Sequence, residues 1–163
     1  MMRIWHYALL PYLSNLQFRG QLRELTAIMR SWRDNGTTNH ILINKVMEYD
    51  KKHLTSYFLR YRAEYIKRYV KDIDKGIFYE FLLFADYKNG EDYIYSAAKN
   101  EIVSVKLVKD IFPEWHNKEY LRVCLSNLYE KHHFGIGKSR ITDEEWARLC
   151  EGYKEITGEE YEI

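Results

Sequence analysis

Cysteine is scarce in this 163-residue chain, which contains only Cys124 and Cys150. Both lie among apolar neighbours in amphipathic stretches, so they indicate buried thiols in a reducing cytosol and not a disulfide framework. Long hydrophobic runs are also lacking, and no segment approaches the roughly 20 apolar residues that cross a bilayer. The apolar run from Trp5 to Leu13 is short and interrupted, so we expect no signal peptide. These absences predict a soluble cytoplasmic protein without membrane contact.

A strong excess of charge of one sign is also lacking. The 25 lysines and arginines balance 24 aspartates and glutamates, which gives a net charge of +1. This near neutrality argues against a nonspecific DNA-binding protein, because such proteins carry a marked basic excess. Cations do cluster on the first two predicted helices, either as solvated helix faces or as a local field for a polyanion. The clustered cations are Arg19, Arg23, Arg30, Arg33, Arg60, Arg62, Lys67, Arg68 and Lys71.

The composition, with 46% hydrophobic and 16% aromatic residues, provides enough core material for a single domain covering residues 1–163. Capping and periodicity signals predict that this domain is mostly α-helical. Ser14 and Gln17 form a capping-box signature for a first helix that ends near Trp32, before the Asn35-Gly36 turn. The expected core face of this helix consists of Leu16, Leu22, Leu25, Ile28 and Met29.

Three further helices are expected from similar signals. Asp50 can cap a helix over roughly residues 51–72, Asn117 or His116 can begin one that continues to Lys131, and a Thr142–Glu145 capping box can begin the last. The expected core residues of the second helix are Leu54, Tyr57, Phe58, Tyr61, Tyr65 and Val70. Those of the last two are Leu121, Val123, Cys124, Leu125, Leu128, Trp146, Leu149, Cys150 and Tyr153.

Residues 73–112 are the least regular part of the sequence. Asn89-Gly90 is a strong turn signal, and the stretches beside it mix strand and helix tendencies. We therefore expect either a small hairpin or extra helices here, which would supply a lid or a dimer surface.

The first thirty residues carry the strongest chemical signal. The chain starts Met1-Met2-Arg3-Ile4, and Glu24 lies in the middle of the predicted first helix. An α-amino group titrates at about pH 7.7–8.0, so a useful fraction is an unprotonated nucleophile at neutral pH. Such an amine can displace a base from C1′ of a nucleotide and form an imine, while a nearby carboxylate manages the protons. Glu24 lies beside the apolar face, where either a shifted pKa or a plain surface ion pair is expected.

These motifs resemble the pyrimidine-dimer DNA glycosylases of the phage endonuclease V type. Met2-Arg3-Ile4 matches the family's Thr-Arg-Ile, and Arg23-Glu24-Leu25 matches its Arg-Glu-Leu. The segment from His53 to Phe58 is similar to the start of the family's long second helix. The opening residues are closer still to a bacterial branch that starts Met-Arg-Ile or Met-Arg-Leu followed by Trp-His.

On this resemblance, residues 1–72 and 113–157 correspond to the family's core, and residues 73–112 are an insertion that the phage-type relatives lack. The resemblance implies a repair enzyme that removes a damaged pyrimidine base and then cuts the strand as an AP lyase. The implied partner is double-stranded DNA with a lesion or a modified base, met by a nucleoid-associated protein of the cytoplasm.

The resemblance also implies which residues act. Glu24 is the essential carboxylate, and the nucleophile is the amine of Met1, or of Met2 if translation begins there, because Met2 is too large for efficient trimming of the initiator. No cofactor and no metal are expected, since the histidines have no Cys or carboxylate partner at ligand spacing. The implied DNA-binding residues are Arg3, Gln17, Arg19 and Arg23.

Two alternatives stay open on the sequence. The pair Met1-Met2 favours a catalytically inactive helical module that binds DNA or protein on the same scaffold. A glycosylase for another base, or for RNA, fits the motifs as well. In each case we expect a monomer, with residues 73–112 as the contact surface if a dimer forms.

Overall fold

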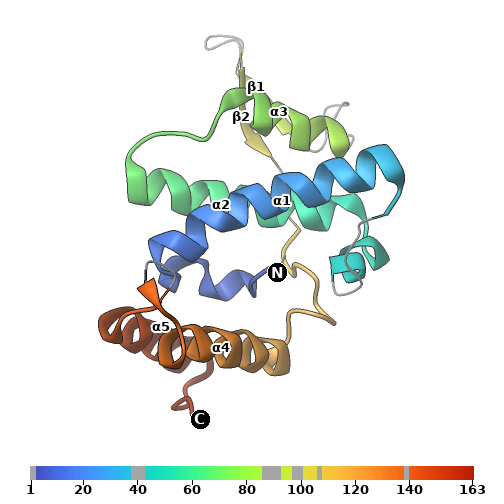
Figure 1. Ribbon diagram of the computed structural model, residues 1–163. Coiled ribbons are helices and arrows are strands. Elements are labelled where there is room, and N and C mark those ends of the chain that lie inside the picture. Colours follow the sequence, from blue (N-terminus) through green and yellow to red (C-terminus); the bar gives the residue numbers. More distant parts are fainter. Residues whose placement is uncertain (1–2, 38–42, 86–92, 97–100, 106–107, 138–139) are drawn as a thin grey trace. The chain divides into compact units, whose positions relative to one another are not determined.

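Figure 1 shows the computed structural model, in which helices predominate, so the mostly α-helical prediction is confirmed. The structure describes residues 3–37, 43–85, 93–96, 101–105, 108–137 and 140–163. By contacts the chain divides into two compact units. Unit 1 comprises residues 1–24 and 113–163, and unit 2 comprises residues 25–112.

Unit 1 is helical throughout its described elements. It contains the 3-10 helix η1 (Tyr7–Tyr12), the residues of α1 (Asn15–Asn35) up to Glu24, and the helices α4 (Lys118–His133) and α5 (Asp143–Thr157).

Unit 2 contains the remainder of α1 and the elements that follow it. These are the 3-10 helix η2 (Ile43–Glu48), α2 (Lys51–Tyr69), α3 (Lys75–Phe84) and the antiparallel strands β1 (Tyr93–Ser96) and β2 (Glu101–Val105). The pairing shifts between Ile94 and Tyr95, which marks a bulge. Residues 73–112 therefore hold both an extra helix and a strand pair, whereas the Asn89-Gly90 turn signal lies outside the described residues.

Local capping explains where most helices begin. The Asp50 carboxylate accepts a hydrogen bond from the Lys52 backbone N at 2.9 Å, and both hydrogen bonds of the Thr142–Glu145 capping box are present. The capping box predicted for Ser14 and Gln17 is wrong. Gln17 is buried and its Oε1 accepts no hydrogen bond from the described residues, so it does not cap the backbone at Ser14.

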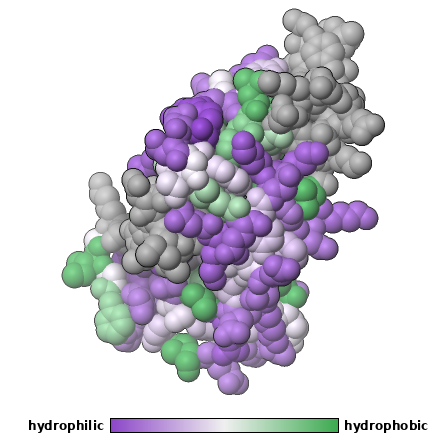
Figure 2. All heavy atoms as spheres, turned by 90° about the vertical axis from the view of Figure 1, so that its right-hand side faces the viewer, coloured by the Kyte–Doolittle hydropathy of each residue, from purple (hydrophilic) through white to green (hydrophobic). Residues whose placement is uncertain are grey.

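Three residues predicted for the core are exposed instead. Leu16 and Val123 each lie two positions from buried residues of their helices, which turns them to the opposite side. Val70 is 88% exposed because it ends α2 in the left-handed conformation, with φ 56°, where the chain leaves the helix. Exposed hydrophobic residues form small, separate areas among hydrophilic ones on the face shown in Figure 2. No helix in the described ranges is long and apolar enough to cross a membrane.

In unit 1, η1 packs closely against α5. The Arg148 guanidinium donates from Nη2 to the Pro11 carbonyl at 2.9 Å, and the Tyr12 hydroxyl donates to Glu155. The Tyr12 ring lies directly over Gly152, because a Cβ built on that glycine would stand 2.5 Å from the ring. A glycine is therefore required on α5 where the ring crosses it.

We expect Gly152→Ala to lower the free energy of unfolding by about 1–3 kcal/mol, because the new methyl group overlaps a ring that is held at both ends. Gly20→Ala is the matched control: its Cβ would meet nothing closer than 3.8 Å, and alanine favours a helix over glycine. Urea denaturation of both variants measures the difference. Equal stabilities of the wild type and Gly152→Ala would contradict the packing described.

Two buried histidines link η1 to the segment before α4. His6 Nδ1 accepts from the Ala8 N at 3.1 Å, so its Nε2 donates to the His116 carbonyl at 3.0 Å. His116 Nδ1 in turn accepts from the Tyr7 N at 3.2 Å, and the His6 and His116 rings stack with centroids 5.1 Å apart. Burial lowers the pKa of His6 to about 4, and it lowers the pKa of His116 well below its usual value. Both rings are therefore neutral in the folded protein.

The free energy of unfolding should fall as the pH drops from 7 towards 4, because the unfolded histidines bind protons near pH 6.5 while the folded ones do not. The shift of His6 corresponds to on the order of 3 kcal/mol. We expect His6→Gln to flatten this dependence between pH 7 and 5, whereas exchange of the exposed His133 for Gln should leave it intact. Denaturation series at several pH values test this, and an unchanged slope in His6→Gln would disprove it.

Unit 2 is organised around the start of α2. His53 Nδ1 accepts from the Phe112 N at 3.1 Å, Ser56 Oγ accepts from the Val108 N at 3.0 Å, and Thr55 Oγ1 donates to the Phe81 carbonyl. The rings of Phe58 and Phe81 stack with centroids 3.9 Å apart. The segment from His53 to Phe58 therefore anchors residues within 73–112.

Candidate active site

The first described residues lie along α1 and are held there by one side-chain amide. Gln21 Oε1 accepts from the Trp5 N at 2.8 Å, and Gln21 Nε2 donates to the Arg3 carbonyl at 2.7 Å. The amide thus bonds one N–H and one C=O two residues apart, as a neighbouring β-strand does. Gln21 is completely buried, so these bonds form away from water.

A second side chain holds the residue between them. The Tyr120 hydroxyl, on the first turn of α4, donates to the Ile4 carbonyl at 2.6 Å. The Ile4 side chain is itself fully buried. Residues 3–5 are therefore fixed by α1, by α4 and by their own packing.

Glu24 lies one turn beyond Gln21 and completes this arrangement. Its Oε2 accepts from the Arg3 backbone N at 2.9 Å and from Gln21 Nε2 at 3.4 Å. Within the described part of the chain, Oε1 accepts no hydrogen bond. Burial raises the pKa of Glu24, and the hydrogen bond from Arg3 opposes this rise in part. The expectation of a carboxylate with a shifted pKa is thus confirmed, and the alternative of a plain surface ion pair is not.

The structure brings only some of the predicted site residues together. Met1 and Met2 lie outside the described residues. Arg3 is half-buried, and its guanidinium stands 5.1 Å from the centre of the Trp5 ring. Arg19 and Arg23 are exposed on α1, whereas Gln17 is buried.

Gln21 and Tyr120 were not found from the sequence. The spacing of Gln21 and Glu24, three positions apart on one helix, places both side chains on the same face and was the one available signal. Tyr120 comes from a helix almost a hundred residues away, so no local pattern indicated it.

The Cys124 thiol lies beside Tyr120. Burial raises the pKa of Cys124 to about 11, so it is a protonated thiol at neutral pH. The predicted burial of Cys124 is confirmed, while Cys150 is half-buried. Across the described residues, no group of three or more His, Cys, Asp or Glu side chains is arranged to hold a metal ion.

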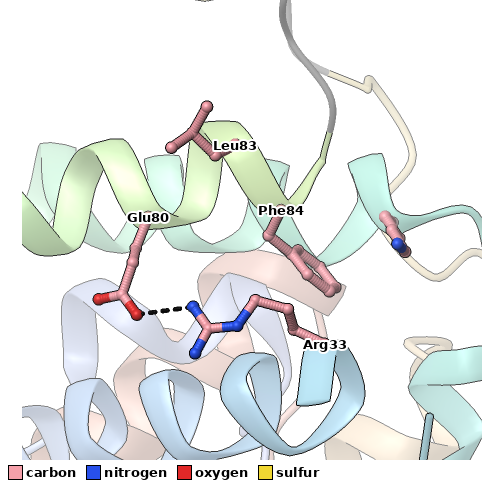
Figure 3. Close-up of a pocket in the computed structure, with 5 residues that line it drawn as sticks. Arg33, Glu80, Leu83 and Phe84 are labelled. Carbon is pink, nitrogen blue, oxygen red and sulfur yellow. Dashed lines mark hydrogen bonds and ion pairs between the residues drawn. The ribbon is translucent and has the colours of Figure 1, made fainter. Parts of the chain in front are cut away.

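Unit 2 contains a separate cavity of about 290 Å³, lined by Arg33, Lys51, Glu80, Leu83 and Phe84. Figure 3 shows Arg33 and Glu80 pointing toward one another, with Leu83 directed away from them. Hydrogen bonds from Arg30 and Arg33 lower the pKa of Glu80 to about 2, so its carboxylate is charged at any ordinary pH. The two guanidinium groups are thus already neutralised in part, which makes the cavity a poor anion site.

Comparison with known proteins agrees with the N-terminal motifs. No curated protein and no solved structure matches the chain. One family model does match, and it covers both Arg3 and Glu24 as well as the segment from His53 to Phe58. The family resemblance predicted from these motifs is therefore confirmed, whereas the assignment to a bacterial branch is not. Residues 2–75 match the family described as pyrimidine dimer DNA glycosylase.

Proposed function

We propose that this protein is a DNA glycosylase with AP lyase activity, in which the first amine of the chain attacks the deoxyribose of a damaged pyrimidine site. One observation carries the proposal: the Arg3 backbone N lies 2.9 Å from a carboxylate oxygen of Glu24. Two residues span at most about 7 Å, so an amine on Met1 or Met2 is at most that far from the Arg3 backbone N. The family match over residues 2–75 supports the same assignment.

The chemistry follows from an amine and a carboxylate held close together. The amine nitrogen bonds to C1′ while the glycosidic bond breaks, and the electron pair of the glycosidic bond leaves with the base. A proton from the amine passes to Glu24 and from there to the ring oxygen O4′ as the C1′–O4′ bond breaks, which gives a protonated imine, while the departing base takes a proton from water. Loss of a C2′ proton then expels the 3′ phosphate by β-elimination, which cuts the strand.

Glu24 suits this role for two reasons. Burial raises its pKa toward the range in which a carboxyl group exchanges protons with an amine and a sugar. Its Oε1 accepts no hydrogen bond from the described residues, so this oxygen can face the substrate. The negative charge also stabilises the cationic sugar that forms as the base departs.

The exposed cations of α1 would bind the DNA backbone. Arg19 and Arg23 follow Gln17 on the same helix, and Arg3 lies next to Glu24. With a net charge of +1, the protein relies on this local group for phosphate contacts. Opening the base stack costs a few kcal/mol and costs least at a lesion, which favours damaged over intact duplex. The contact predicted for Gln17 stays a prediction.

Borohydride should trap a covalent adduct between the protein and duplex DNA that contains a pyrimidine dimer or an abasic site. We expect Glu24→Gln, or acetylation of the first amine, to slow trapping at least about 100-fold, since each removes a group that moves protons or forms the imine. Glu130→Gln changes an exposed glutamate of α4 and is the matched control. Intact-mass measurement of each preparation identifies the residue that carries the free amine.

The trapping assay also separates the two functions that the sequence left open. Trapping that persists in Glu24→Gln and in the acetylated protein would rule out the proposed mechanism. Tight DNA binding by a wild type that forms no adduct would assign the chain to the inactive binding module.

Removing Arg19 or Arg23 should weaken binding to all duplexes by a similar factor. If each side chain contacts one phosphate, the slope of log affinity against log salt should drop by about 1 in Arg19→Ala and in Arg23→Ala. Arg122→Ala, which removes an exposed arginine of α4, should leave the slope unchanged. Fluorescence anisotropy between low and moderate salt measures these slopes, and identical slopes in all four proteins would refute the assignment.

A further inference from the structure

The side chain of Gln21 forms its shorter hydrogen bonds with the backbone of the N-terminal segment, and its Nε2 is also 3.4 Å from Glu24 Oε2. Both amide atoms bond that segment, at 2.8 Å to the Trp5 N and at 2.7 Å to the Arg3 carbonyl. No other uncharged side chain has a donor and an acceptor on one plane at this reach, asparagine being one methylene shorter. The side chain is also completely buried, so water does not replace either bond.

We propose that Gln21 is a positioning residue that fixes the register of residues 3–5 on α1 and so holds the Arg3 backbone N, from which the first amine of the chain extends, next to Glu24. The catalytic part of this inference rests on the proposed function. Gln21 does not itself touch the reacting atoms, and acts only through the segment that it holds.

The geometry explains why the register is unique. A slip of the segment by one residue would replace the Arg3 carbonyl and the Trp5 N–H by groups that point to the other edge of an extended chain. The same slip would remove the Arg3 N from Glu24 and pull the buried Ile4 out of its site. All three contacts therefore select a single alignment.

This alignment matters because the amine is at the end of the clamped segment. A displacement of about 1 Å at a reacting group can cost on the order of 100-fold in rate. Without the amide, the segment loses the two hydrogen bonds of Gln21 and keeps those to Glu24 and Tyr120. The amine would then sample many positions relative to the carboxylate.

The first test replaces the amide by a group of equal length without hydrogen bonds. In Gln21→Met we expect single-turnover trapping at saturating DNA to slow about 100-fold, with DNA affinity within threefold of the wild type. Thr55→Val is the control, because it removes a buried hydrogen bond of unit 2 that does not involve the N-terminal segment. A Gln21→Met protein that traps as fast as the wild type overturns the proposal, as does a loss of affinity equal to the loss of rate.

The second test uses a side chain that can form both hydrogen bonds when it is protonated and cannot form them both when it is ionised. In Gln21→Glu the introduced carboxyl group, when protonated, offers an O–H to the Arg3 carbonyl and a C=O to the Trp5 N, as the amide does. When ionised it repels the Arg3 carbonyl. The trapping rate of Gln21→Glu, divided by that of the wild type at the same pH, should therefore rise at least tenfold between pH 8 and pH 5. A ratio that stays constant overturns the proposal, because a merely structural defect would not recover on protonation.

Amide hydrogen exchange separates failure of this inference from failure of the proposed function. The Trp5 N–H should exchange at least tenfold faster in Gln21→Met than in the wild type, while amides in the middle of α4 keep their rates. If the wild type forms no adduct at all, the proposed function fails, and Trp5 exchange still decides the register. Faster exchange in Gln21→Met then supports the role of Gln21, and unchanged exchange overturns it.

Discussion

A short segment that belongs to neither a helix nor a strand, residues 3–5, enters the protein interior. Buried N–H and C=O groups need partners, so this segment can be buried only if side chains supply them. Gln21, Glu24 and Tyr120 do so, and each comes from a helix. These side chains take the place of a neighbouring strand. In the proposed mechanism, Glu24 is also the carboxylate that exchanges protons with the attacking amine, so that folding and the proposed chemistry depend on the same hydrogen bonds.

Burial, which strengthens these hydrogen bonds, also determines the protonation of the ionisable groups near them. It raises the pKa of Glu24, keeps His6 and His116 neutral and keeps the Cys124 thiol protonated. Of these four groups, the proposed mechanism uses only Glu24. The histidines and the thiol are buried and uncharged, and among the described residues no group of three or more His, Cys, Asp or Glu side chains is arranged to hold a metal ion. Exposed arginines on α1 then provide the positive charge that the buried groups do not.

The sequence correctly predicted features that depend on residues close together in the chain, such as helix caps. The caps at Asp50 and Thr142 are formed as expected, since a capping side chain bonds a backbone group only two or three residues away. The same rule failed at Gln17, because its side chain is buried and does not cap the helix. Glu24 was found because its motif resembles a known family, but Gln21 was missed because its partners are 16 and 18 residues distant along the chain. Periodicity reports which face of a helix is apolar, and it does not report which backbone that face will meet. The strand pair and α3 within 73–112 were left as alternatives for the same reason.

The start of α2 has a consequence for the role of residues 73–112. Three polar side chains there, of His53, Thr55 and Ser56, bond backbone groups at Phe112, Phe81 and Val108. Thr55 and Ser56 are completely buried. Excising residues 73–112 would therefore leave buried hydroxyl groups without their backbone partners in an apolar environment. Only simultaneous replacement of those side chains by apolar ones could make the segment dispensable.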